Sequence, residues 1–165
     1  LEDIVFEGYG PGGVAILVET MTDNRNRTVS DVRHAFSKFG GNLGTDGSVS
    51  YLFNKIGTIH IAKNYSEDDL MEIVLESGAD DLVDEGEYFE IVTGSAELSS
   101  VLKALKNNNI ENTNAELTLR AETSIAIDQE MSEKVLKIMD FMDELDDVQE
   151  VHTNAEFPDN FEVQE

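Results

Sequence analysis

The strongest constraint on the fold is an alternation of strand and helix patterns within residues 58–122. Alternating apolar residues predict strands, and apolar residues at spacings of three and four predict amphipathic helices. The patterns follow one another as TIHIA (58–62), EDDLMEIVLESG (67–78), DLVDE (81–85), YFEIVT (88–93), SAELSSVLKALKNNN (95–109) and AELTLRAE (115–122). This β-α-β-β-α-β order is typical of the ferredoxin-like fold. The sequence therefore predicts a ferredoxin-like domain over residues 58–122.

The flanking segments predict a second domain that is built from both ends of the chain. Two strand patterns at 4–10 and 14–22, joined by the turn GPGG, predict a hairpin. A helix over 28–39 follows, with Thr28 as its N-cap and Gly40 and Gly41 as its stop. The remaining patterns are a loop, a strand at 48–55, a strand at 123–128, a helix at 129–145, a strand at 148–154 and a frayed acidic tail at 155–165. The predicted fold class is α+β, with a discontinuous domain (1–57 and 123–165) that carries the inserted domain (58–122).

The charge of the chain is strongly uneven. The formal net charge is −24, yet residues 21–56 carry five Lys or Arg against three acids, a net charge of +2. Residues 57–165 carry six cations and 28 acids, a net charge of −22. Because phosphate contacts come from Lys, Arg, backbone N–H groups and helix N-termini, only residues 21–56 suit a polyanionic partner. For the chain as a whole, the simplest interpretation of the net charge of −24 is that it keeps the protein soluble.

Catalytic and metal-binding patterns are weak. The acidic cluster between Asp140 and Glu150 lacks the spacing of a calcium loop, and the interpretation that we favour is a solvated helix face. The three histidines are scattered, without the spacing of a zinc site, and the segment GGNLGTDGS lacks the Lys-Ser/Thr ending of a phosphate-binding loop. The chain has no cysteine and no apolar run long enough to span a membrane. We expect no enzyme, no metal, no cofactor, no small-molecule substrate and no membrane partner.

Several long stretches resemble the YebC/PmpR family, whose mitochondrial relatives activate translation of a cytochrome oxidase subunit. The resemblance rests on FEGYGPGGVAILVE (6–19), on TDNRNRTVSDVRHAFSKFGGNLGTDGSVSYLF (22–53) and on MDELDDVQEVHTN (142–154). It implies a three-domain protein in which a basic helical N-terminal domain precedes two α+β domains, the third inserted in the second. The resemblance also implies that this chain lacks that N-terminal domain.

The resemblance further implies a non-enzymatic regulator of gene expression. The family label is a probable transcriptional regulator that binds DNA, and the alternative is a ribosome-associated translation factor that contacts ribosomal RNA. Nucleic acid, bound mainly with the help of the N-terminal domain, and the ribosome are the expected partners. A small-molecule sensor ranks below both, because no ligand-specific residues can be named for it. The expected location is the bacterial cytoplasm, with the mitochondrial matrix as the alternative.

The residues expected to meet nucleic acid surround the predicted helix. Asn24, Arg25, Asn26 and Arg27 precede its N-terminus, where free N–H groups and the helix dipole favour an anion. Two cations on its exposed side and a glycine-rich loop at its other end complete the hypothesis: Arg33, Lys38, Gly40, Gly41, Asn42 and Gly44. A helix of this length separates its two end loops by about 16 Å, so both need not touch one partner.

Overall fold

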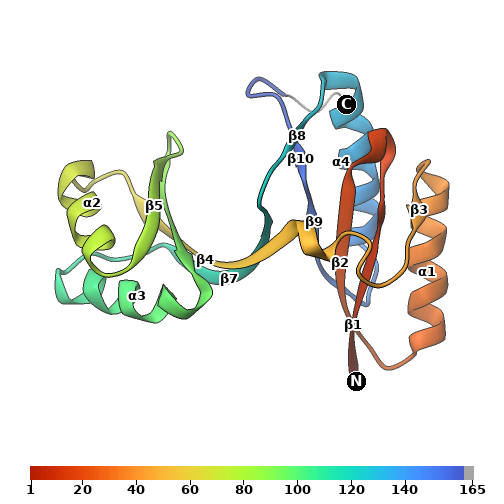
Figure 1. Ribbon diagram of the computed structural model, residues 1–165, viewed down its shortest axis with the longest axis horizontal. Helices are drawn as coiled ribbons and strands as arrows, with labels where there is room; N and C mark the ends of the chain where they lie inside the picture. Colours follow the sequence, from red (N-terminus) through yellow and green to blue (C-terminus); the bar gives the residue numbers. More distant parts are fainter. Residues whose placement is uncertain (162–165) are drawn as a thin grey trace. The chain divides into compact units, whose positions relative to one another are not determined.

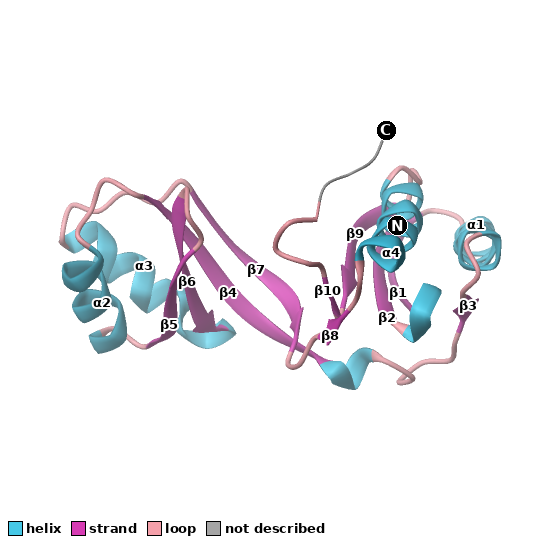
Figure 2. Cartoon of the chain, turned by 90° about the horizontal axis from the view of Figure 1, so that it is seen from above, coloured by secondary structure: helices cyan, strands magenta, loops and turns pink. Residues whose placement is uncertain are grey.

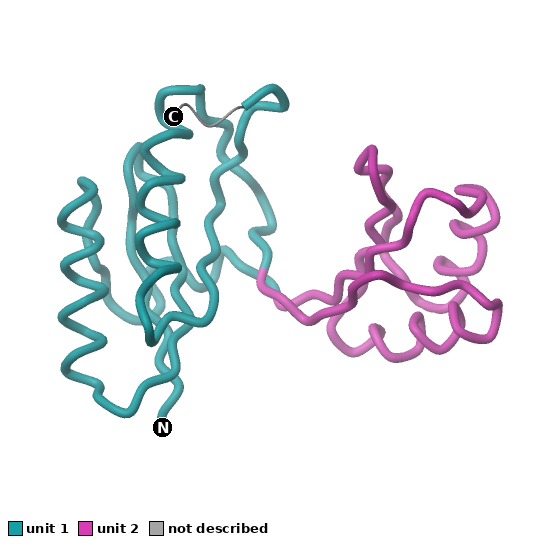
Figure 3. The backbone as a smooth tube through the Cα atoms, turned by 180° about the vertical axis from the view of Figure 1, so that it is seen from behind, with its two compact units in different colours: residues 1–54, 120–165 teal, residues 55–119 magenta. Residues whose placement is uncertain are grey.

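Residues 1–161 are described by a computed structural model, in which the chain forms two compact units (Figure 3). One unit contains Leu1–Asn54 and Arg120–Glu165, and the other contains Lys55–Leu119. The chain thus leaves the first unit, forms the second and returns. The fold is α+β, a discontinuous domain with an inserted ferredoxin-like domain, which confirms the predicted fold class.

The inserted unit is a four-stranded sheet with both helices on one face (Figure 2). Its elements are β4 (Phe53–Ala62), α2 (Glu67–Glu76), β5 (Ala79–Asp84), β6 (Tyr88–Gly94), α3 (Leu98–Asn107) and β7 (Asn114–Ala121). The strand order β5-β6-β4-β7 is that of a ferredoxin-like sheet. Ile59, Ile61 and Ile91 from the central strands are fully buried against Leu70 and Leu105 of the helices.

The discontinuous unit is a second four-stranded sheet, in the order β3-β1-β2-β9 (Figure 1). Its elements are β1 (Glu2–Tyr9), β2 (Ala15–Thr22), α1 (Arg25–Lys38), β3 (Asn42–Leu43), β8 (Ile125–Ala126), α4 (Gln129–Asp143), β9 (Val148–Thr153) and β10 (Ala155–Glu156). The predicted hairpin of β1 and β2 is confirmed, since the two strands pair antiparallel along their whole length.

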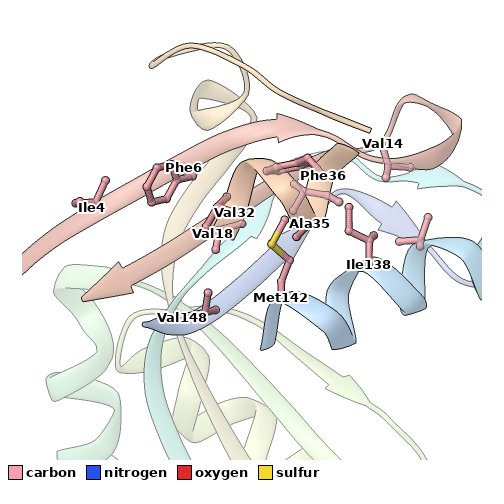
Figure 4. Close-up of a cluster of buried hydrophobic side chains, with 12 residues drawn as sticks. Ile4, Phe6, Val14, Val18, Val32, Ala35, Phe36, Ile138, Met142 and Val148 are labelled. Atoms are coloured by element: carbon pink, nitrogen blue, oxygen red, sulfur yellow. The ribbon is translucent and has the colours of Figure 1, made fainter. Parts of the chain in front are cut away.

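Helices α1 and α4 cover the same face of this sheet and enclose its core (Figure 4). Val18 on β2, Phe36 on α1 and Ile138 and Met142 on α4 are fully buried there. Because side chains alternate along a strand, the residues between the core positions of β1 and β2 point to the opposite face. That second face carries the carboxylates of Glu7 on β1 and Glu19 on β2.

Two predicted boundaries are wrong. Residues 48–55 are not a separate strand: a 3-10 turn at Ser50–Leu52 leads into β4, which runs on through Ala62. Gly57 lies within β4 and does not interrupt it. A Cβ at this position would overlap Thr93 Oγ1, so the glycine permits close packing there. In the predicted frayed tail, Ala155–Glu156 form β10 and pair in parallel with β8. Residues 162–165 of that tail lie outside the described residues.

Candidate nucleic-acid interface

Helix α1 begins one turn earlier than the sequence predicts. Asn24 is the N-cap, because its side-chain oxygen accepts a hydrogen bond from the backbone N–H of Arg27 at 3.2 Å. Thr28, the predicted cap, is instead a buried residue within the helix, and its hydroxyl donates to Asp147 Oδ2 at 2.8 Å. The segment from Arg25 to Arg27 is therefore the first turn of the helix rather than a loop that precedes it.

Arg27 is engaged in contacts with its own chain. Its Nη2 lies 2.9 Å from Asp147 Oδ1 and its Nε lies 3.1 Å from Asp147 Oδ2, so the pair is bidentate. Nη2 also lies 2.9 Å from Asp23 Oδ1. Hydrogen bonds to Asp147 and then to Asp23 raise the pKa of the Arg27 guanidinium. Hydrogen bonds from Arg27 and then from Thr28 lower the pKa of Asp147. These contacts tie the start of α1 to the turn before β9.

The other predicted cations of α1 are more accessible. Arg25 forms a surface ion pair with Glu2 at 3.1 Å, in which both side chains are at least half exposed, and such pairs contribute little stability. Lys38 stands over the Phe141 ring, with Nζ 4.8 Å from the ring centroid. Arg33 and Asn26 are exposed.

Four exposed residues follow one line along α1. Their spacing of four, three and four places them on one helix face, and we call them the outer stripe: Asn26, Ser30, Arg33 and Ser37. All four side chains carry hydrogen-bond donors of the kinds that contact phosphate and sugar oxygens. The one acid of the helix, Asp31, lies on a different line. The outer stripe is therefore an acid-free polar face on a chain with a net charge of −24.

The glycines after α1 have structural tasks within the chain. Gly40 has a φ of +78° and follows the helix C-cap, while the N–H of Gly41 donates to the carbonyl of Phe36 at 2.8 Å. A Cβ at Gly41 would overlap the carbonyl oxygen of Tyr9, and one at Gly44 would lie 2.7 Å from Ser48 Oγ. Asn42 is exposed on the short strand β3. Gly41 and Gly44 thus permit close approach by the chain itself, and contact with a partner there stays a prediction.

Glu7 organises the rest of this loop. Glu7 is 6% exposed, and its carboxylate accepts hydrogen bonds from the backbone N–H groups of Gly47 (2.7 Å), Val49 (3.0 Å) and Ser50 (2.6 Å). Burial by itself raises the pKa of Glu7, but these hydrogen bonds outweigh it and hold the pKa below the ordinary 4.5. Next to this cradle, Tyr51 is 73% exposed. The loop is thus held rigidly while it presents an aromatic ring.

The structure separates the predicted site residues into groups. Asn26 and Arg33 share the outer stripe, whereas Asn24 and Arg27 fix the helix start and Lys38 lies against an aromatic ring. Helix α1 has 14 residues, so the first turn and the loop after it are about 21 Å apart. Sequence reasoning gave no role to Glu7 or Tyr51, and it placed Asp147 only in the acidic cluster interpreted as a solvated helix face. Glu7 could have been noticed as an acid directly after the apolar run Ile4–Phe6 of β1, but its loop partners could not.

The fold is that of a two-domain α+β protein with an exposed polar helix face. Comparisons with known proteins identify the family to which the chain belongs. Residues 1–155 match the family described as TACO1/YebC second and third domain. The chain therefore belongs to the TACO1/YebC family, which confirms the resemblance found in its sequence. Within residues 1–161, no helix is long and apolar enough to cross a membrane.

Curated relatives from several bacteria are similar over nearly the whole chain. A probable transcriptional regulatory protein of Legionella pneumophila (strain Paris) is 54% identical over 152 residues, which cover 92% of this chain and 62% of the relative. One from Francisella tularensis subsp. novicida is 50% identical, covering 95% of this chain and 64% of the relative. The chain thus spans less than two thirds of the length of these relatives.

A solved structure is similar in fold as well as in sequence. The crystal structure of a conserved hypothetical protein from Aquifex aeolicus matches with a TM-score of 0.84 and 43% identity. The match covers 96% of this chain and 66% of the Aquifex chain. Both units of the fold are therefore shared with that protein.

Proposed function

We propose that this chain is part of a non-enzymatic regulator of gene expression that contacts nucleic acid through the outer stripe of α1. The observation that carries the proposal is an acid-free face of Asn, Ser and Arg donors on a chain of net charge −24. The names of the relatives, probable transcriptional regulatory proteins, support a regulatory role. The expected place of action is the cytoplasm of a bacterium.

The outer stripe suits backbone contact better than base reading. Amide, hydroxyl and guanidinium donors bind phosphate and sugar oxygens, and these contacts position a protein without selecting a sequence. Arg33 and Asn26 are the two side chains of the stripe with the reach and the paired groups for bidentate contact with a base edge. We therefore expect weak sequence preference from this part of the protein. Binding to duplex DNA through this face would be mainly electrostatic and strongly dependent on salt.

A second candidate, a translation factor that contacts ribosomal RNA, is favoured by Tyr51. This ring is 73% exposed at the end of the loop that Glu7 holds in place. Recognition of folded RNA commonly uses backbone contacts together with an aromatic ring that stacks on an unpaired base. Duplex DNA offers no unpaired base to such a ring. Tyr51 therefore discriminates between the two candidate targets.

The test is a binding titration with the complete protein at physiological salt. Labelled duplex DNA and a labelled RNA hairpin of equal length would be titrated with wild type, with Asn26→Ala combined with Arg33→Ala, and with Lys137→Ala as the control on α4. We expect the double variant to bind less tightly and to lower the salt slope by about one unit for each phosphate that it no longer neutralises. Unchanged binding of the double variant, or equally weakened binding of the control, contradicts the proposed interface.

Tyr51→Ala then separates the two targets. Selective loss of RNA binding supports the translation factor, and competition by purified ribosomes for the labelled DNA supports it further. Equal binding of Tyr51→Ala and wild type to the hairpin, with DNA retained against excess ribosomes, supports the transcriptional regulator. Arg27→Ala is a poor test of either, because Arg27 is paired with Asp147 and its removal changes an internal contact as well as the surface.

A further inference from the structure

Three potential metal ligands converge on one face of the β3-β1-β2-β9 sheet, the face opposite α1 and α4. Glu19 lies on β2, while Glu150 and His152 lie two residues apart on β9. One ligand atom from each of the three lies within 4.8 Å of the other two. His152 Nε2 is 3.7 Å from Glu19 Oε2 and 3.8 Å from Glu150 Oε2. The sequence interpretation of scattered histidines missed this group, because Glu19 comes from a distant part of the chain.

His152 is buried in a way that leaves one ring nitrogen unsatisfied. Its side chain is 7% exposed, and Nε2 is buried without a hydrogen-bond partner. Phe53 lies beside the ring, with the two centroids 6.5 Å apart. A buried polar atom without a partner is costly, so an unsatisfied nitrogen that faces two carboxylates calls for a ligand. Glu19 and Glu150 are 35% and 44% exposed, so both carboxylates are partly open to solvent beside that nitrogen.

The strand register adds an independent reason to expect a cation. Glu19 and Glu150 are direct cross-strand partners in the antiparallel pair of β2 and β9. Like charges directly opposite one another destabilise a sheet, and a cation held between the two carboxylates offsets this repulsion. The register shifts between Glu19 and Thr20, and irregularities of this kind re-aim side chains and are frequent next to functional sites.

We propose that Glu19, Glu150 and His152 bind a divalent transition-metal cation, with Zn²⁺ as the first candidate. One imidazole nitrogen and two carboxylates are ligands that zinc accepts, whereas Mg²⁺ and Ca²⁺ prefer oxygen alone. Zinc bond lengths imply ligand atoms about 3.4 Å apart in a tetrahedron. The two histidine–glutamate separations of 3.7 and 3.8 Å need a small contraction, and the two glutamate oxygens, which lie within 4.8 Å of each other, must also draw together. Water from the exposed side supplies the fourth ligand. The ion joins β9 to β2 and neutralises their opposed carboxylates.

The competing explanation is a protonated His152 held between the two glutamates with no metal. The decisive experiment is calorimetric titration of chelator-treated protein with Zn²⁺, in a buffer with excess Mg²⁺ that occupies oxygen-only sites. We expect one equivalent of Zn²⁺ to bind, the melting temperature to rise, and Co²⁺ in its place to give the absorption bands of a nitrogen- and oxygen-ligated ion.

Variants assign the site. Glu19→Gln changes a partly exposed side chain, so this variant should fold. Combined with His152→Gln in one protein, it should weaken Zn²⁺ binding by at least about tenfold. The control is His60→Gln, since His60 pairs with Glu90 at 3.2 Å in the ferredoxin-like unit, and it should bind Zn²⁺ as wild type does. The absence of saturable binding in wild type, or unchanged binding by Glu19→Gln, overturns the proposal and leaves the protonated histidine. Nucleic acid is absent from this experiment, so its result is independent of the proposed function.

Discussion

The two ends of helix α1 are fixed in opposite ways. At its start, side chains make the contacts: Arg27 forms a bidentate pair with Asp147, and the Asn24 side chain caps the helix. At its end, backbone groups make the contacts: Gly41 packs against the backbone of β1, and the loop that follows donates three backbone N–H groups to the Glu7 carboxylate. The outer stripe between the two ends presents its side chains to solvent instead.

This difference teaches how to interpret a cluster of cations or glycines. The arginines in the first turn of α1 suggested a phosphate site, yet the charge of Arg27 is balanced by Asp23 and Asp147. The glycines after α1 suggested close approach to a partner, yet Gly41 already faces the carbonyl of Tyr9. A residue that satisfies its own fold is a weaker candidate for a partner contact than an exposed residue such as Arg33.

Glu7→Ala should have the largest effect on stability. It leaves three backbone N–H groups without their carboxylate partner, and we expect the free energy of unfolding to fall by about 3 kcal/mol. Urea unfolding followed by circular dichroism measures this loss. Asp46→Ala, an exposed acid of the same loop, is the matched control and should stay within about 0.5 kcal/mol of wild type. Equal stabilities of the two variants would show that Glu7 does not hold the loop.

Gly41→Ala should cost less, about 2 kcal/mol, because the added Cβ overlaps the carbonyl oxygen of Tyr9 and the backbone must shift. The same unfolding measurement applies, with Asn42→Ala on the exposed part of β3 as the control. If Gly41→Ala is as stable as this control, the glycine is not required by packing. Its role in contact with a partner would then gain weight.

The acid sensitivity of the chain should come in part from Glu7. The pKa of Glu7 and the pKa of Asp147 are lower in the folded state than their ordinary values of 4.5 and 3.8. Both carboxylates therefore contribute stability above those ordinary values and lose it as the pH falls through their folded pKa. Glu7→Gln should be less stable than wild type at pH 7, with the difference shrinking below about pH 4.5. A constant difference from pH 7 to pH 3 would contradict this linkage.

The smallest effect should come from the ion pairs at the start of α1. A double-mutant cycle of Arg27→Ala and Asp147→Asn should give a coupling free energy that is favourable, smaller than the destabilisation in Gly41→Ala and reduced by salt. The control cycle is Arg25→Ala with Glu2→Gln, a more exposed pair that should show no measurable coupling. Equal coupling in the two cycles would remove the distinction between a structural arginine and a surface one.

Local patterns predicted the elements well where each element carries its own signal. The alternation in β1 and β2 and the apolar spacing of α2, α3 and α4 predicted those elements within a few residues. Predictions failed where the deciding partner is remote. The start of α1 moved to Arg25 because Asn24 rather than Thr28 caps it, and Thr28 is held by Asp147, 119 residues away. Glu7 and Val49, which define the loop, are 42 residues apart.

By itself, the sequence determined the fold class, the family and the uneven distribution of charge. These properties depend on the periodicity of apolar residues, on composition and on contiguous motifs, all of which can be seen in the amino-acid sequence itself. Only the tertiary structure decided which charges are balanced internally, which glycines serve packing, and that Glu19 meets Glu150 and His152. The physical reason is that pairing, burial and ligand geometry act between atoms near in space. Their positions follow from the strand register and from the packing of α1 and α4 on the sheet.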